Sequence, residues 1–138
     1  MNKVLVDASP LIAVSDESEG KAHLQCTRIY NSIGENFVTT LPCLTEAMYF
    51  LGASRGWSGQ ARLWSLIENN SLSVYNLIEE DLLRMQILMD KYQDTPMDFA
   101  DASLVVAAEV LKVNRIFTLD GDFYIYRIND TQSFEVIP

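Results

Sequence analysis

Short apolar segments alternate with segments of helical periodicity along most of the chain, and this alternation limits the folds available to it. Five short runs have the apolar, β-branched composition of strands: residues 4–6, 37–40, 72–75, 115–118 and 134–137. Strands separated by helices are joined by crossover connections, which place neighbouring strands parallel in one sheet. The sequence therefore predicts an α/β fold. We expect a single domain over residues 1–138, an αβα sandwich with a central, mainly parallel sheet whose last strand lies at an edge.

Apolar residues three and four positions apart predict helices between these strands. The predicted helices cover residues 11–14, 22–33, 44–51, 60–68, 79–92 and 95–112. Gly34 and Gly52 are interpreted as the ends of the second and third of these helices. In the last helix, Thr95 is expected at the N-cap and Pro96 at the first helical position. Asp98 is expected at the third position, where its carboxylate can reach back to the cap.

The composition indicates a hydrophobic core that needs no covalent crosslinks. Hydrophobic residues make up 49% of the 138 residues, and a domain of this length buries roughly two-thirds of its unfolded surface. Cys26 and Cys43 lie in apolar segments without metal-binding spacing, which indicates two buried thiols in a reducing compartment. Because His23 is the only histidine, a zinc site is not expected. Asp7 and Pro10 interrupt the N-terminal apolar run, and no run reaches the roughly 20 residues of a membrane span, so the predicted location is cytoplasmic.

The charge balance argues against a nucleic-acid partner unless some of the acidic residues hold metal ions. Nineteen acidic and ten basic residues give a formal net charge of −9, whereas proteins that bind nucleic-acid backbones usually carry a basic face. Bound divalent cations would offset part of the negative charge where a substrate arrives. The positions of the acidic residues therefore decide how the net charge is interpreted.

Two aspartates lie just after predicted strands. Asp7 comes after the strand at 4–6, and Asp120 comes two residues after the strand at 115–118. Binding sites of open parallel sheets lie beyond the carboxyl ends of the strands, which makes both residues candidates for a functional site. Each could instead serve only as a turn or N-cap residue.

Acidic residues also occur in two otherwise apolar helical segments. Glu46 lies near the start of the helix that follows the second strand, and Asp98 and Asp101 share one face of the last helix. The positive end of the helix dipole would explain Glu46, and a capping box would explain Asp98. Asp101 has no comparable structural explanation, and burying its carboxylate without a partner would be unfavourable.

Four carboxylates that meet at one end of the sheet would repel one another. At about 5 Å and an effective dielectric constant near 20, each pair contributes roughly 3 kcal/mol of repulsion. No lysine or arginine lies beside Asp7, Glu46, Asp101 or Asp120 in the sequence, so a divalent cation is the expected counter-charge. Ligand sets made only of oxygen favour Mg²⁺ or Mn²⁺, and such ions activate water for attack on phosphodiesters.

The segments that contain these acids resemble the PIN-domain family, which includes VapC-like toxin ribonucleases. The resemblance runs from Val4 to Phe123 and rests on four segments: VLVDASPLI at 4–12, LTEA at 44–47, DFADASL at 98–104 and FTLDGDF at 117–123. It implies an endoribonuclease, dependent on Mg²⁺ or Mn²⁺, that hydrolyses RNA phosphodiester bonds. It also implies the toxin of a toxin–antitoxin pair, with RNA as substrate and a small antitoxin protein as partner.

The resemblance assigns catalytic and metal-binding roles to four acids: Asp7, Glu46, Asp101 and Asp120. Ser9 and Thr118 match positions whose hydroxyl groups orient a carboxylate or a water. Asp98 and Asp122 lie near the quartet, and we treat either as a helper or a substitute for one of its members.

Basic and aromatic residues give weaker indications of how a substrate or partner would bind. Arg28, Arg55 and Arg62 are candidate phosphate contacts, although arginines on a solvated surface would have the same pattern. Trp57 and Trp64 could contact an antitoxin or a second copy of the chain in a homodimer, because aromatic residues dominate the binding energy of interfaces. Ordinary packing would explain them equally well.

Two other functions remain open from the residues alone. A phospho-acceptor receiver domain is also a small α/β fold with acids beyond its strands. However, the first strand here supplies only Asp7, and no lysine follows the strands at 115–118 or 134–137. A non-catalytic PIN-like protein-interaction module would suit the acidic composition, which favours a basic partner. That module would leave the repulsion among the predicted carboxylates unexplained.

Overall fold

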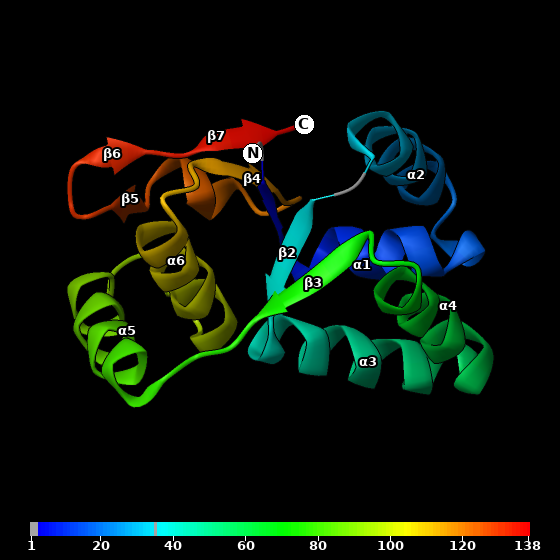
Figure 1. The fold of residues 1–138 in the computed structure, drawn as a ribbon, viewed down its shortest axis with the longest axis horizontal. Helices are drawn as coiled ribbons and strands as arrows, with labels where there is room; N and C mark the ends of the chain where they lie inside the picture. The colour runs from blue at the N-terminus through cyan, green and yellow to red at the C-terminus, as the bar shows by residue number, and fades with distance from the viewer. Residues whose placement is uncertain (1–2, 35) are drawn as a thin grey trace.

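The sheet of the computed structural model has five strands in the order β3-β2-β1-β4-β7, and every neighbouring pair is parallel (Figure 1). The structure describes residues 3–34 and 36–138. The strands are β1 (Val4–Val6), β2 (Phe37–Thr40), β3 (Leu72–Tyr75), β4 (Arg115–Phe117) and β7 (Glu135–Ile137). The predicted α/β class and parallel sheet are confirmed, and the C-terminal strand lies at an edge, as predicted.

Within the described residues, six α-helices flank this sheet. They are α1 (Ala8–Ser15), α2 (Lys21–Ile33), α3 (Leu41–Arg55), α4 (Trp57–Glu68), α5 (Glu79–Lys91) and α6 (Phe99–Leu111). In Figure 1, α5 and α6 lie on one side of β2 and β3, and α1, α2 and α4 lie on the other. None of the helices in the described ranges combines the length and apolar character of a membrane span.

Short elements follow α1 and β4. These are the 3-10 helices η1 (Glu17–Glu19) and η2 (Gly121–Tyr124) and an antiparallel hairpin of β5 (Arg127–Ile128) and β6 (Gln132–Ser133). The hairpin was not predicted, because its strands are two residues long and carry no alternating pattern.

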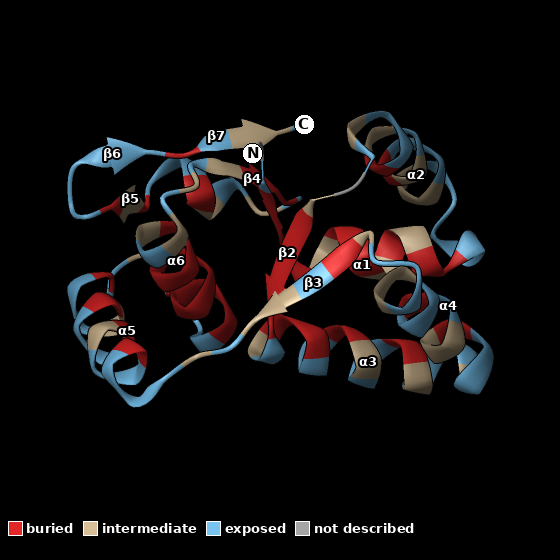
Figure 2. Ribbon diagram, viewed as in Figure 1, coloured by how far each residue is buried: buried red, intermediate tan, exposed pale blue. Residues whose placement is uncertain are grey.

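The core lies on both faces of the central strand. All three residues of β1 are fully buried, as are Phe37 in β2 and Phe117 in β4 (Figure 2). Strands buried on both faces are apolar throughout, which explains why these runs lack an alternating polar pattern. Cys26 and Cys43 are buried with free thiols, as predicted.

The start of α6 differs from the prediction. Asp98, and not Thr95, is the N-cap, and the helix begins at Phe99. The Asp98 carboxylate accepts the N–H of Asp101 at 2.7 Å, and the N–H of Asp98 donates to Asp101 Oδ2 at 3.3 Å. The two aspartates thus form a reciprocal capping box. Because aspartate caps a helix at least as well as threonine, the helix starts later and Asp101 lies in its first turn.

The prediction that the helix after β2 ends at Gly52 is wrong, because α3 continues to Arg55. Gly52 lies inside the helix, where the Gln60 side chain from α4 packs against it. A Cβ atom at this position would lie 2.5 Å from Gln60 Nε2, which donates to the carbonyl of Met48 at 3.0 Å. Gly56, whose φ of 65° favours glycine, follows the last residue of α3 instead.

The strand order has a switch point at β1. From β1 the chain crosses to β2 on one side, and it later returns to β4 on the other side. Ligand sites of open parallel sheets form where the strand order reverses in this way. The carboxyl ends of β1 and β4 are therefore the expected place for a functional site.

Candidate metal centre

Asp7 stands at the carboxyl end of β1 and is the N-cap of α1. Its Oδ1 accepts the N–H of Ala8 at 2.7 Å, and α1 begins three residues earlier than predicted. Its Oδ2 accepts the hydroxyl of Thr118 at 2.8 Å. Each carboxylate oxygen has two lone pairs, so the Thr118 bond leaves one on Oδ2 for a cation, while Oδ1 also lies 3.9 Å from the Cys43 thiol. Capping and metal binding are therefore compatible at Asp7.

Thr118 connects Asp7 to Asp120. Its hydroxyl donates to Asp7 and also accepts the N–H of Asp120 at 3.0 Å. Asp120 Oδ1 in turn accepts the N–H of Asp122 at 2.9 Å, which starts η2. Ser9 acts differently, because its hydroxyl accepts the N–H of Leu119 at 3.4 Å and so contacts backbone.

Asp101 reaches the same place from the first turn of α6. Its Oδ2 accepts the N–H of Asp98 and, at 3.3 Å, the hydroxyl of Tyr126. Tyr126 is fully buried between Tyr92 and Phe123. The Asp101 carboxylate is therefore held by a backbone group and by an aromatic hydroxyl from a distant segment.

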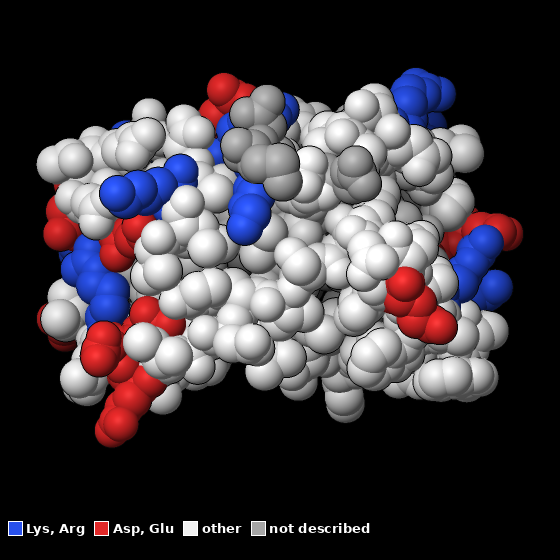
Figure 3. Space-filling model, in the orientation of Figure 1, with Lys and Arg blue, Asp and Glu red and all other residues white. Residues whose placement is uncertain are grey.

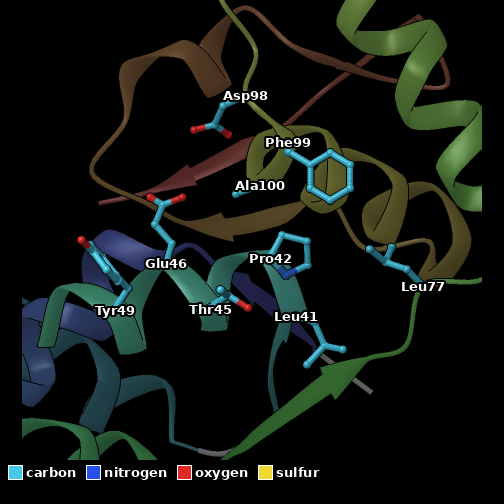
Figure 4. Close-up of a pocket in the computed structure, with 9 residues that line it drawn as sticks. All are labelled: Leu41, Pro42, Thr45, Glu46, Tyr49, Leu77, Asp98, Phe99 and Ala100. Carbon is cyan, nitrogen blue, oxygen red and sulfur yellow. The ribbon is translucent and has the colours of Figure 1, made fainter. Parts of the chain in front are cut away.

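Three of the four predicted acids meet in space. Asp7, Asp101 and Asp120 each offer an oxygen, and these oxygens lie within 4.8 Å of one another, a group that could hold a metal ion. Glu46 is not part of this group. It is exposed in the second turn of α3, and its carboxylate and that of Asp98 point toward the same space in Figure 4.

The acidic group lacks a basic counter-charge. Burial and the neighbouring Asp98 and Asp7 raise the pKa of Asp101 to about 8. Burial first, and then Asp120 and Asp98, also raise the pKa of Asp7, and burial and Asp98 raise that of Glu46. In residues 3–34 and 36–138, none of the ion pairs involves any of these acids. The predicted repulsion is therefore present and uncompensated by the chain itself.

The candidate phosphate contacts Arg55 and Arg62 lie away from this group. Arg55 Nε is 3.5 Å from Asp16 Oδ1, and Arg62 Nη1 is 3.0 Å from Glu17 Oε1, beyond the far end of α1. Arg28 is exposed on α2. On the face in Figure 3, charged side chains gather mainly at the two ends of the molecule. The positions of these arginines favour the surface interpretation.

A cavity of about 720 Å³ opens beside the acidic group, between the N-terminal turns of α3 and α6 (Figure 4). Its lining is largely apolar and consists of Leu41, Pro42, Thr45, Glu46, Tyr49, Leu77, Asp98, Phe99 and Ala100. Glu46 and Asp98 are its only acids in the described lining. The cavity and the acidic group therefore share one end of the sheet.

Two residues of the site were not predicted. Tyr126 follows an irregular segment, and its position in the sequence, 25 residues from Asp101, does not predict their contact. Cys43 was predicted only as a buried thiol, yet its Sγ lies 3.9 Å from Asp7 Oδ1 and 3.8 Å from the carbonyl of Ala100. The clusters of aromatic residues at 123–126 and of acids at 120–122 are the only signals that could have found Tyr126.

Replacing Thr118 by valine tests how firmly the carboxylates are positioned. Valine keeps the volume but leaves the buried Asp7 oxygen and the Asp120 N–H without this partner. Each unsatisfied buried group destabilises by about 1–3 kcal/mol, so we expect Thr118→Val to lower the free energy of unfolding by about 2 kcal/mol in urea titrations. Thr27→Val is the matched control, because Thr27 Oγ1 is buried without a hydrogen-bond partner in the described structure. Equal stability of the two variants would contradict the role of Thr118.

The fold and the acidic group define a class of protein: α/β domains that gather aspartates from separate strands and helices at one end of a parallel sheet, where they could hold a metal ion. Within this class, the sequence pattern of the PIN domain matches residues 4–129. The chain belongs to the PIN-domain family. A comparison with curated protein sequences found no match.

Solved structures with a similar fold include toxins of bacterial toxin–antitoxin pairs. Mycobacterium tuberculosis VapC20, a toxin that cleaves the sarcin–ricin loop, superposes with a TM-score of 0.76 at 16% identity, covering 87% of this chain and 92% of that chain. A toxin–antitoxin complex from Klebsiella pneumoniae gives 0.66 at 18% identity, covering 88% and 90%. DNA-bound VapBC from Salmonella typhimurium gives 0.63 at 15% identity, covering 99% and 98%. At these identities the likeness is one of fold.

Proposed function

We propose that this protein is a metal-dependent endoribonuclease that hydrolyses RNA phosphodiester bonds. The observation that carries the proposal is the convergence of Asp7, Asp101 and Asp120, whose oxygens lie within 4.8 Å of one another without a basic partner in the described chain. The PIN-domain family and the sarcin–ricin loop cleavage by a toxin of similar fold support the same reaction.

The donor set suits Mg²⁺ or Mn²⁺. Its ligands are hard carboxylate oxygens, and among the described residues no histidine or thiolate joins the group. When bound, such an ion supplies positive charge at the phosphodiester and lowers the pKa of a water for attack on phosphorus. The chain itself holds its carboxylates in place through hydrogen bonds that are already formed.

The side chains have distinct roles in this proposal. Asp7, Asp101 and Asp120 hold the ion, and Thr118 positions two of them by bonding Asp7 and the Asp120 backbone. Glu46, the fourth acid of the family pattern, lines the adjoining cavity together with Asp98 and acts on the substrate in this proposal. Asp98 helps by fixing Asp101 through the capping box. The Asp122 backbone N–H holds the Asp120 carboxylate, and the Ser9 hydroxyl holds the backbone of Leu119.

The partner in this proposal is a small antitoxin protein that inhibits the nuclease, as the toxin–antitoxin complexes of similar fold suggest. Trp57 and Trp64 support a protein contact on α4, because 68% and 44% of their surfaces are exposed and exposed aromatics favour interfaces. The same exposed surface of α4 would form the interface in a homodimer. The net charge of −9 favours a basic partner.

The test is cleavage of a structured RNA by the purified protein with Mn²⁺ and with a chelator. We expect cleavage with the ion and none with the chelator. Absence of cleavage in both conditions would favour the interaction module, which the pairing of Arg55 and Arg62 with acids also favours. Calorimetric titration with Mn²⁺ then distinguishes the nuclease from the non-catalytic interaction module, because only the nuclease is expected to bind the ion.

A further inference from the structure

The proposed hydrolysis gives no role to the apolar and aromatic residues that line the cavity beside the acidic group. Phe99 and Tyr49, on its lining, expose 51% and 80% of their surfaces. Pro42 and Leu41 extend the apolar wall between them (Figure 4). An apolar cavity with aromatic walls is the usual environment for a flat, uncharged ring.

The polar groups of the cavity restrict what such a ring can carry. Asp98 Oδ1 accepts the N–H of Asp101, and its second oxygen has no hydrogen bond from any residue in the described ranges. Glu46 stands at the same rim. Two carboxylates repel a phosphate but accept hydrogen bonds from N–H donors. The cavity therefore suits an uncharged group that presents N–H donors on one edge.

We propose that the cavity receives one unpaired base of the RNA, next to the phosphodiester that is cleaved. The base stacks on Phe99, and its edge donates to the Asp98 carboxylate. Adenine, cytosine and guanine carry an amino group on that edge. Uracil carries a single N–H there, flanked by two carbonyl oxygens that the carboxylate repels, so the cavity disfavours uracil. This inference rests on the proposed ribonuclease function and adds a base preference to it.

A base explains the position of the cavity better than a protein side chain does. The cavity adjoins the acidic group, so a nucleotide whose phosphate lies at Asp7, Asp101 and Asp120 can extend its own base between α3 and α6. Stacking of the base on an aromatic ring needs no positive charge on the protein, so this contact does not depend on an arginine near the cavity. A protein partner on this surface is the competing outcome of the test.

The experiment maps cleavage sites in a pool of single-stranded RNA of random sequence with Mn²⁺. Wild type should cut at least about five-fold less often where uracil occupies one particular position beside the cleaved bond. Phe99→Ala should reduce that discrimination and lower kcat/KM by roughly five-fold or more. Asp98→Asn keeps the helix cap but adds an N–H donor, so it should cut uracil-containing sites more readily. These ratios are measured within one pool, so a general loss of rate does not affect them.

Trp57→Ala is the matched control, because it removes an exposed aromatic ring outside the cavity lining and should leave the base preference unchanged. Binding is measured separately in the Asp7→Asn background, using a short RNA with 2-aminopurine at one position. Phe99→Ala should weaken this binding roughly five-fold or more, even if wild type does not cleave. Equal base preference at all positions in wild type would overturn the inference while leaving the nuclease intact. Unchanged RNA binding by Phe99→Ala, with a changed oligomeric mass, would assign the cavity to a protein partner.

Discussion

Asp7→Asn protein should lose RNA cleavage by about two orders of magnitude or more while remaining folded. Loss of a group that only supports a metal ligand already lowers metal affinity or activity by about 10- to 100-fold. Asp7 is a proposed ligand itself, and a neutral amide binds a hard cation less well than a carboxylate. The expected loss is therefore at least as large as that range.

The same substitution should stabilise the metal-free protein. Burial raises the pKa of Asp7, which means that the folded state disfavours the ionised carboxylate. Asparagine is an equally good N-cap for α1, and its amide can donate to the Thr118 hydroxyl in place of accepting from it. One hydrogen bond between residue 7 and Thr118 is thus kept in the reversed direction, while one buried charge and its repulsion are removed.

Urea titrations with a chelator and cleavage assays with Mn²⁺ measure both effects on the same preparation. The matched control is Glu68→Gln, which removes an exposed acid at the end of α4 and should change neither quantity. Unaltered cleavage by Asp7→Asn would contradict the proposed function. Destabilisation by Asp7→Asn would show that the carboxylates already have a counter-charge in the metal-free protein.

The stability of the metal-free protein should fall as the pH rises from about 4 to about 8. The folded state raises the pKa of Asp101 from 3.8 to about 8, so between these values the folded chain holds a proton that the unfolded chain has released. The slope of the unfolding free energy with pH is then negative. The stability from this group is fully present below pH 4 and is lost as the pH passes 8.

Thermal unfolding in a chelator at pH 5, 6, 7 and 8 tests this dependence. The decrease should reach at least about 1.4 kcal/mol, the value of one pKa unit. Asp101→Asn should flatten the decrease and should be more stable than wild type at pH 8. A wild-type stability that rises over this range, with no difference in Asp101→Asn, would show that Asp101 is ionised without cost.

The geometry also separates two kinds of acid that share one sequence pattern. Asp7, Asp101 and Asp120 are held by hydrogen bonds from Thr118, Tyr126 and neighbouring backbone N–H groups, so their positions are set before any ligand arrives. Glu46 has exposed surroundings on α3. The fold therefore fixes the three aspartates, which could hold a metal ion, more firmly than it fixes Glu46.

Local sequence signals predicted much of the fold and the candidate ligands. The buried strands were recognisable because parallel strands covered on both faces are apolar without interruption, and Asp7 and Asp120 were found because they directly follow such strands. The helix boundaries were less predictable. Thr95 and Asp98 compete as caps on nearly equal terms, and Gly52 lies inside α3, where a side chain from α4 packs against it.

The sequence by itself determined the class of the fold, the family and which acids to examine, because these follow from periodicity and from residues near in the chain. Only the tertiary structure decided that three of the acids meet while Glu46 stands apart, that Tyr126 bonds Asp101 across 25 positions, and that an apolar cavity adjoins them. These features depend on distances between segments that are remote in the chain. Such distances are set by packing of the whole core, which no local pattern encodes.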